Sequence, residues 1–412
     1  MTTRTDMQAS SLSSIAALVE AMHDKKAQDQ VRLHRRELHQ IPEIAYREYR
    51  TAEYVERCLQ GLGLDVTRPT ETSVLGTLRT GRVGPTLVIR ADMDALPISE
   101  DTGLPYASAN GHMHACGHDG HMASVLTVAE IISKCADEFH GEFRFLFQHA
   151  EEPLPSGAPD IVAAGVLSGA DMVVGHHLST PLQLGVVSAA RGPLMAACDY
   201  FEITVVGGGG HGAMPHQSTD PISIGSQIVG NLQHIVAREV SALDSAVLSV
   251  TGFDGGTEYN VCPSTVVLRG TIRSFDDDVR GLLARRLEEI AVGIAKAHRA
   301  EAQVKMIYGS PPVNNDDHLA DIVAQALTDL QLETPAEGRR KSTGGEDFAW
   351  YQREVPGVFF LVGATASGAD VVPHHHPKFD FDERAMDNAV KLFIYFVQST
   401  MRRSPIEAGA SA

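Results

Sequence analysis

The chain of 412 residues has little cysteine and comparatively little positive charge, and both shortages exclude classes of protein. Its five cysteines are odd in number and widely spaced, which does not fit a disulfide framework and favours a reducing compartment. Lysine and arginine number 34 against 52 aspartates and glutamates, giving a formal net charge of −18. A field of that sign repels nucleic acid and anionic membrane surfaces, so we expect neither as a partner.

The N-terminal region also lacks a long hydrophobic run. Its apolar stretch, residues 15–19, is too short for the hydrophobic region of a signal peptide or for a membrane span. We therefore expect a cytoplasmic protein. A hydrophobic content of 43% with 21% charged residues is ordinary for a folded protein, and the length allows two or three domains.

Patterns typical of helix and strand alternate along the first half of the chain. The predicted elements are helices 10–40, 51–62 and 123–134 and strands 86–90, 141–147 and 172–175. Such alternation predicts an α/β domain. Open α/β sheets place their sites at the carboxyl ends of the strands, and here histidines or acids follow each predicted strand.

The order changes between residues 197 and 309. Strands are predicted at 200–206, 246–251, 265–273 and 302–308, with helices at 221–239 and 277–299. This βαββαβ order is typical of ferredoxin-like domains. The earlier alternation then resumes, with helix 319–330, strand 357–363 and helix 384–400.

We therefore predict a discontinuous two-domain α/β chain. A mixed-sheet α/β domain that carries the site comprises residues 1–196 and 310–412, and the ferredoxin-like domain, residues 197–309, is inserted between its two parts. The insertion is expected to act as a lid or as a dimerisation module.

Histidine, cysteine and acidic residues concentrate in three segments, 114–121, 148–152 and 374–377. Thiolate, imidazole and carboxylate together suit divalent transition metals, and these segments hold enough ligands for two ions. A loop histidine or a buried thiol alone usually binds nothing. Four histidines and a cysteine between His112 and His121 make metal binding the better interpretation.

Two residue pairs are the leading candidates. Cys116 and His118 flank Gly117, and on an extended loop their side chains can converge on one ion. Glu151 and Glu152 directly follow a strand, so their carboxylates leave on opposite sides of the backbone. This favours Glu152 as a metal ligand and Glu151 as the general base that activates water.

Other candidates stay open from the residues alone. His176 and His177 end a predicted strand, and any of the histidines in 374–376 could be a ligand or merely solvated. Asp92 and Asp94 could bind metal or orient a ligating imidazole, and we favour the orienting role. Arg273 ends an apolar strand and could bind a substrate carboxylate, although a surface ion pair is the commoner role of such an arginine.

Taken together, these motifs resemble the co-catalytic metallopeptidase superfamily of aminoacylases, and within it the branch of hippurate hydrolases and auxin-conjugate amidohydrolases. The matching segments occur in the same order over nearly the whole chain: 35–43, 90–97, 113–119, 148–152, 210–216, 260–263, 270–273, 344–348 and 375–383. The resemblance implies a two-metal hydrolase that cleaves N-acyl-L-amino acids such as hippurate-like conjugates.

The resemblance also implies residue roles. The metal ligands would be Cys116, His118, Glu152, His177 and His375, holding two divalent ions, with zinc favoured and manganese, cobalt or nickel as alternatives. Glu151 would be the general base. His211 would reach across a homodimer, formed through the inserted domain, to polarise the scissile carbonyl, and Asn260 and Arg273 would lie near the substrate carboxylate.

Four positions depart from the pattern of this branch. Gly208 is usually lysine, Gly212 alanine, Cys262 isoleucine and His149 proline. None of these changes removes a proposed ligand or the base. A glycine at position 208 is expected to loosen its loop and to alter substrate choice.

Three alternatives remain. A dipeptidase or carboxypeptidase would act on the same combination of amide and carboxylate. A cysteine amidase would use Cys116 as nucleophile. A binding protein would capture an acyl amino acid without cleaving it, but such a protein would have no need of Glu151.

Overall fold

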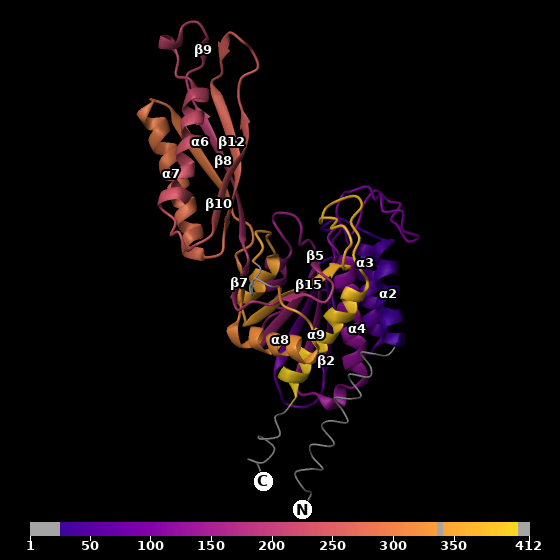
Figure 1. Ribbon diagram of the computed structural model, residues 1–412. Helices are drawn as coiled ribbons and strands as arrows, with labels where there is room; N and C mark the ends of the chain where they lie inside the picture. The colour runs from indigo at the N-terminus through magenta and orange to yellow at the C-terminus, as the bar shows by residue number, and fades with distance from the viewer. Residues whose placement is uncertain (1–24, 336–340, 403–412) are drawn as a thin grey trace, which may run out of the picture. The chain divides into compact units, whose positions relative to one another are not determined.

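The computed structural model describes residues 25–335 and 341–402, and its described residues fall into two compact units (Figure 1). Unit 1 takes those within Met1–Gly192, Asn314–Arg340 and Trp350–Ala412, and unit 2 takes Pro193–Val313 and Lys341–Ala349. The first part of the helix expected over 10–40 lies outside the described residues.

Unit 1 is built on a seven-stranded mixed sheet with the strand order β1-β2-β4-β3-β5-β15-β6. Its strands are β1 (Asp65–Thr67), β2 (Val74–Arg79), β3 (Thr86–Asp92), β4 (Glu142–Gln148), β5 (Met172–Gln183), β6 (Val187–Ser188) and β15 (Gly357–Thr365). The four neighbouring strands β4, β3, β5 and β15 are parallel, whereas the strands at either side pair antiparallel. The predicted mixed-sheet α/β fold is therefore confirmed, although β1, β2 and β6 were not anticipated.

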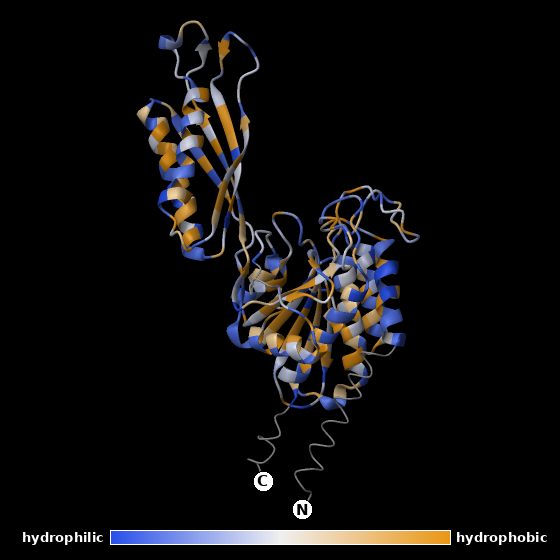
Figure 2. Ribbon diagram, in the orientation of Figure 1, coloured by the Kyte–Doolittle hydropathy of each residue, from blue (hydrophilic) through white to orange (hydrophobic). Residues whose placement is uncertain are grey.

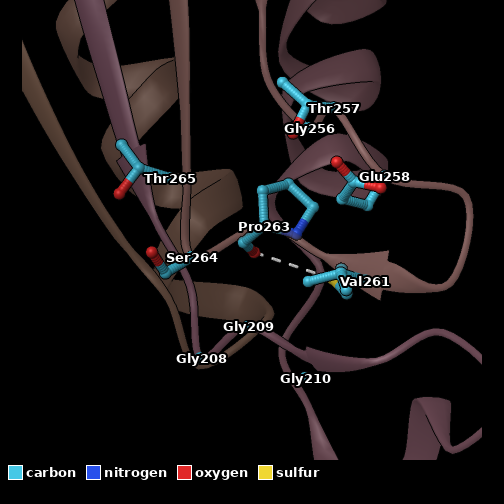
Figure 3. Close-up of a pocket in the computed structure, with 11 residues that line it drawn as sticks. Gly208, Gly209, Gly210, Gly256, Thr257, Glu258, Val261, Pro263, Ser264 and Thr265 are labelled. Carbon is cyan, nitrogen blue, oxygen red and sulfur yellow. Dashed lines mark hydrogen bonds between the residues drawn. The ribbon is translucent and has the colours of Figure 1, made fainter.

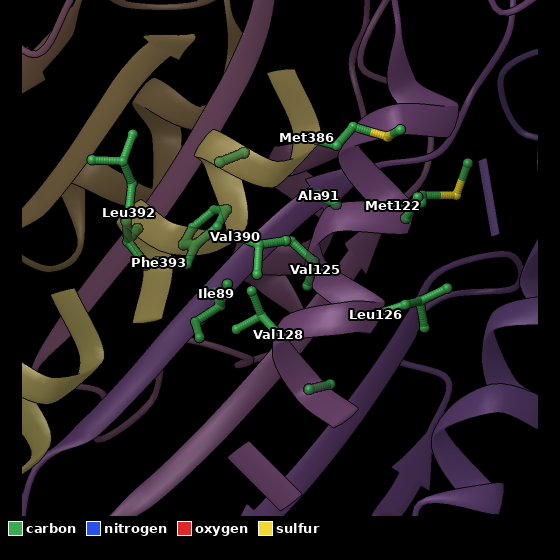
Figure 4. Close-up of a cluster of buried hydrophobic side chains, with 14 of the residues drawn as sticks. Ile89, Ala91, Met122, Val125, Leu126, Val128, Met386, Val390, Leu392 and Phe393 are labelled. Atoms are coloured by element: carbon green, nitrogen blue, oxygen red, sulfur yellow. The ribbon is translucent and has the colours of Figure 1, made fainter. Parts of the chain in front are cut away.

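Helices cover this sheet, and all of them except the short helix Ala158–Ala163 share one hydrophobic core with it. They are α2 (Lys25–His39), α3 (Tyr49–Gly61), α4 (His118–Lys134), α5 (Ala158–Ala163), α8 (Asp317–Asp329) and α9 (Arg384–Met401). Figure 4 shows Ile89 of β3, Val125 of α4 and Phe393 of α9 in this core, and all three are fully buried. Burying one side chain of this size contributes about 1.5–3 kcal/mol. In Figure 2 the strands of unit 1 are largely orange, because most of the side chains that they bury are hydrophobic.

Helix α4 begins earlier than its periodicity indicated. We expected a helix from residue 123 with His118 on an extended loop, but His118 is the first helical residue. The preceding Gly117 has φ 91°, a left-handed conformation that residues with a Cβ rarely adopt. Glycine thus allows an abrupt turn from the loop of Cys116 into the helix of His118.

Unit 2 is an antiparallel sheet packed against two amphipathic helices. In chain order it contains β8 (Ala197–Val206), α6 (Pro221–Arg238), β10 (Ala246–Asp254), β12 (Thr265–Ser274), α7 (Asp277–Ala297) and β13 (Glu301–Ile307). The sheet order is β10-β12-β8-β13. Burial alternates along β8, so one face of the sheet meets the helices and the other does not. The role of this unit as lid or dimerisation module stays a prediction.

The boundaries of the units differ from our expectation of 196 and 309. The segment Lys341–Ala349 belongs to unit 2, although it follows part of unit 1 in the sequence. The cause is backbone pairing, because the Ser342 N–H donates to the Leu194 carbonyl at 2.9 Å and the Ala196 N–H donates to the Ser342 carbonyl at 3.0 Å. Within the described ranges, no helix combines the length and apolarity needed to cross a membrane.

Candidate metal centre

Unit 1 brings together ligand atoms from four separate segments. Three groups of side chains each offer donor atoms within 4.8 Å of one another: Cys116, His177 and His374; Cys116, Glu152 and His375; His118, Glu151 and Glu152. Cys116 and Glu152 each belong to two groups. Overlapping groups of this kind are what two neighbouring cations need, and the donors are those that zinc and similar metals prefer.

His118 presents one ring nitrogen to this cluster. Its Nδ1 lies 2.8 Å from the Asp94 carbonyl oxygen, which can only accept, so Nδ1 carries the proton. Its Nε2 is buried, makes no hydrogen bond among the residues described, and lies 4.0 Å from Oε1 of Glu152. A buried ring nitrogen without a hydrogen-bond partner is a position that a cation would satisfy.

Cys116 lies beside His177, with 3.4 Å between Sγ and Nε2. Burial, followed by the charges of Glu152 and Glu151, raises the pKa of the Cys116 thiol well above its ordinary value. A coordinated cation has the opposite effect, because it deprotonates a ligating thiol. The donor set therefore fits a divalent metal.

The two adjacent histidines of β5 point to different surroundings. We expected both just beyond the end of a strand, but β5 continues to Gln183 and contains them. Because side chains alternate along a strand, His176 packs against Phe360 and Phe393, whereas His177 faces Cys116. The His177 Nδ1 donates to the Leu178 carbonyl at 2.7 Å, which leaves Nε2 for a metal.

The turn after β4 carries Glu151 and Glu152, and the carboxylate of Asp94 fixes its backbone. The two Asp94 oxygens accept from the N–H groups of Glu151 and Glu152 at 3.0 and 3.1 Å. Asp94 thus orients the turn through its backbone, in addition to its carbonyl contact with His118. His375 completes the cluster, since its Nε2 lies 3.2 Å from Oε1 of Glu152.

The neighbours of His375 have other roles. His374 accepts the N–H of Thr180 at 3.4 Å through Nε2, and the exposed His376 accepts the N–H of Lys378 at 3.1 Å through Nδ1. These bonds shape the loop, and His374 remains a member of the donor group with Cys116 and His177, whereas His375 is the member of the triplet that contacts Glu152.

Asp92 belongs to a buried network beneath the cluster. Its Oδ1 accepts from Nδ1 of His121 at 2.7 Å and its Oδ2 from Arg90 at 2.8 Å. Burial raises the pKa of Asp92, but the charges of His118 and Arg90 outweigh it and hold that pKa well below its ordinary value. Asp92 therefore orients His121 and Arg90, neither of which is a proposed ligand, and its role in orienting a ligating imidazole stays a prediction.

Sequence reasoning counted His121 among the clustered histidines but gave it no role of its own, although its spacing of three residues from His118 places both on one helix face. Its Nε2 accepts the N–H of Leu178 at 2.9 Å, so the proton lies on Nδ1 and points to Asp92. The backbone pairing of β3 with β5 ends at Arg90 and Gly175, just before His176 and His177. His121 therefore anchors β5 directly after His177.

A second network fixes the first turn of α4. Oδ2 of Asp119 lies 2.8 Å from Nδ1 of His39 and accepts from Nε of the buried Arg35 at 3.2 Å. Burial lowers the pKa of His39, but hydrogen bonds to Asp119 and Glu100 outweigh it and raise that pKa to about 9. These contacts give a physical role to the motif at residues 35–43.

The remaining candidates lie in unit 2. His211 is exposed in β9 (Gly210–His211), which pairs with β11 (Val261–Cys262) directly after Asn260. The Ala213 N–H donates to Nδ1 of His211 at 3.1 Å, so the ring proton lies on Nε2. Figure 3 shows the adjoining cavity of about 570 Å³, which the glycines at 208–210 line on one side.

Arg273 lies in β12 of the four-stranded sheet, at the end of that strand away from Asn260. It pairs with Cys198 in the β12–β8 ladder, whereas Thr265, near Asn260, pairs with Val206. Eight residues of strand separate Arg273 from Thr265 by roughly 26 Å. The Nε of Arg273 donates to the Thr343 carbonyl at 3.1 Å. One copy of unit 2 therefore does not bring Arg273 together with Asn260 and His211.

A mixed α/β unit that brings thiolate, imidazole and carboxylate donors close together is an arrangement suited to metal-dependent hydrolysis. The family described as peptidase family M20/M25/M40 matches residues 88–399, and the chain belongs to this family. The resemblance seen in the sequence is thereby confirmed.

Individual proteins and solved structures are also similar to this chain. An N-acyl-L-amino acid amidohydrolase of Geobacillus stearothermophilus is 50% identical over 285 residues, which are 69% of this chain and 77% of the relative. An N-acetyl-L-cysteine deacetylase of Bacillus subtilis is 41% identical over 90% of this chain and 86% of its own. The solved YXEP protein of Bacillus subtilis, a dinuclear metal binding peptidase, has a TM-score of 0.81 and 34% identity, over 92% of this chain and 99% of its own.

Proposed function

We propose that this chain is a two-metal amidohydrolase that cleaves N-acyl-L-amino acids, hippurate-like or related conjugates, into a carboxylic acid and a free amino acid. The observation that carries the proposal is the set of overlapping donor groups, which share Cys116 and Glu152. The acyl-amino-acid substrate is suggested by the 50% identical relative of that activity.

The proposed ligands are Cys116, His118, Glu152, His177 and His375. Zinc suits this donor set best, with manganese, cobalt or nickel as alternatives. When bound, such cations supply Lewis acidity, which polarises a carbonyl and makes water acidic enough to attack near neutral pH.

Glu151 is the proposed general base. It is adjacent to the ligand Glu152 on the turn that Asp94 fixes, which keeps the two carboxylates at a constant separation. Glu151 would take a proton from the attacking water and later deliver it to the departing amine. General acid–base transfer of this kind contributes about 10²–10⁴-fold in rate.

We further propose that the enzyme acts as a homodimer. The Nε2–H of the exposed His211 would donate to the oxygen on which negative charge develops. Asn260 and Arg273 would contact the substrate carboxylate. Because His211 and Asn260 lie far from Arg273 in one copy of unit 2, the first two are proposed to come from the partner copy.

The structure bears on the alternatives. A cysteine amidase needs a low-pKa thiol, whereas the surroundings of Cys116 raise its pKa. A dipeptidase or carboxypeptidase is the main competing function, because a peptide presents the same amide and carboxylate and the similar YXEP protein is described as a peptidase. An acyl-amino-acid binding protein is the non-enzymatic alternative.

The deciding experiment incubates the protein, reconstituted with zinc or manganese, with a mixed pool of N-acyl-L-amino acids and dipeptides. Mass spectrometry then follows the loss of each compound. Selective loss of acyl amino acids supports the proposal and names the preferred acyl group. Loss of dipeptides alone makes the enzyme a peptidase, and no loss at all favours the binding protein.

A further inference from the structure

The turn that carries Glu151 and Glu152 begins with three consecutive N–H groups that all donate to buried carboxylates. Asp94 accepts from Glu151 and Glu152, as described above. The first N–H of the series, that of Ala150, donates to Oε1 of Glu48 at 2.8 Å. Glu48 is 102 positions earlier in the chain and is fully buried.

Ala150 has an unusual backbone conformation. Its φ is 50°, in the left-handed region that residues with a Cβ seldom occupy. Its carbonyl accepts the N–H of Gly157 at 2.7 Å. A Cβ at Gly157 would lie 2.2 Å from the carbonyl oxygen of His149, so glycine is required for this close approach. Both polar backbone groups of Ala150 are thus held by partners from outside the turn.

Glu48 is itself firmly placed. It precedes the first residue of α3, and its carbonyl accepts the N–H of Ala52 at 2.8 Å. Its Oε1 also accepts the N–H of Tyr46 at 3.0 Å. The side chain therefore ties the start of a helix to the turn after β4. It contacts neither of the proposed reactive carboxylates directly.

We propose that Glu48 is a positioning residue for the reaction, holding Ala150 in its left-handed conformation so that Glu151 and Glu152 leave the backbone in their required directions. This inference rests on the proposed roles of that pair. Without the Glu48 acceptor, Ala150 relaxes toward an ordinary conformation. The Glu151 N–H belongs to the peptide that Ala150 turns, so its bond to Asp94 is weakened and the Glu151 side chain is displaced, whereas Glu152, one residue further on, keeps its own bond to Asp94.

The test compares Glu48→Gln with Glu48→Leu in full-length protein reconstituted with zinc. Burial, followed by the charge of Asp94, raises the pKa of Glu48 to about 7, so its neutral form is populated near neutrality and glutamine imitates that form. Glutamine retains the acceptor, and kcat is expected to stay within about threefold of wild type. Leucine removes the acceptor, and kcat is expected to fall about 100-fold with KM and zinc content unchanged.

Two further variants make the test specific. In the Glu48→Leu background, Ala150→Gly is expected to restore part of kcat, because glycine adopts φ 50° without an external clamp. Glu43→Leu is the matched control, since Glu43 accepts the N–H of Thr51 at 2.9 Å in the same region but does not contact the turn. Its kcat is expected to be nearly unchanged.

The proposal is overturned if Glu48→Leu and Glu43→Leu have equal kcat, or if the activity of Glu48→Leu falls only in parallel with its zinc content. If Glu48→Leu does not fold, Glu48→Asp decides: its shorter side chain withdraws the acceptor, and wild-type kcat in that variant would contradict the proposal. Failure of the proposed function is visible separately, as a wild-type protein that cleaves no acyl amino acid.

Discussion

The proposed site residues of unit 1 and unit 2 are held in opposite ways. In unit 1, the fully buried His118 and Asp92 are hydrogen-bonded to Asp94 and His121, which lie 24 and 29 positions away in the chain. In unit 2, His211 and Asn260 are exposed, and His211 is oriented by the N–H of a residue two positions away. Ligands that must share cations need fixed mutual distances, whereas a group that meets the substrate has to remain accessible.

The largest effect expected from this contrast is at Glu151. Glu151→Gln should lower kcat about 10³-fold, because an amide cannot accept the proton from water. Zinc content should stay at two ions per chain, since the ligand Glu152 is untouched. Kinetics and elemental analysis on the same sample check this. Loss of zinc together with activity would show that the roles of Glu151 and Glu152 are exchanged.

Removing the exposed donor of unit 2 should have the next largest effect. His211→Ala is expected to lower kcat about 10²-fold while metal content and thermal stability stay at wild-type values. Mixing it with Glu151→Gln provides a sharper test. If His211 acts across a dimer, random mixed dimers regain about a quarter of wild-type activity, because one of the two sites in each hybrid is complete. Activity that stays at the level of the parents would place His211 in its own subunit's site.

A buried residue of unit 1 should instead affect metal affinity. His121→Ala removes the acceptor for the Leu178 N–H and the donor to Asp92, so His177 loses its fixed position. Zinc affinity, measured by competition with a chelator, is expected to fall about 10–100-fold. His112→Ala is the matched control from the same motif, with its side chain outside the donor groups. Equal zinc affinities in the two variants would show that His121 does not support the metal site.

The smallest expected effect is a change in how the free energy of unfolding depends on pH. The pKa of His39 is raised from 6.5 to about 9, so its charged form stabilises the folded protein. That contribution is complete below about pH 6.5, is lost as pH rises through about 9, and amounts to at most about 3 kcal/mol. Denaturant unfolding between pH 6 and 9.5 should show a steeper decline for wild type than for His39→Gln. If the free energies of unfolding of the two proteins decline in parallel as pH rises, His39 does not make this contribution.

Periodicity in the sequence predicted most helices and strands of both units, because an amphipathic helix such as α7 carries its burial pattern locally. Periodicity failed for elements whose structure is determined by contacts with distant parts of the chain or by backbone conformation. Four of the five residues from His176 to Thr180 are polar and do not resemble a strand, yet parallel pairing of His176 to Ser179 with β15 makes this segment part of β5. The early start of α4 depends on the backbone of Gly117, which side-chain periodicity does not report.

The candidate site shows the same limit. Clustering of ligand residue types indicated Cys116, His118 and Glu152, and the fold brings them together. Glu48 was not singled out and His121 was given no individual role, because their partners lie 102 and 57 positions away. Contacts between such distant residues leave no local pattern in a single sequence. The resemblance alone favoured His177 over His176, and β5 adds a physical reason, because side chains alternate along the strand and His177 lies beside Cys116.

The pairing of Ser342 with Leu194 and Ala196 has a consequence for how this protein can be cut and recombined. A gene fragment encoding only residues 193–313 omits a segment that unit 2 contains. Such a fragment would expose the backbone of Leu194 and is expected to fold poorly or aggregate. Transplanting unit 2 into a relative therefore requires exchanging two separate stretches of sequence, so recombination with a single pair of breakpoints would not transfer it intact.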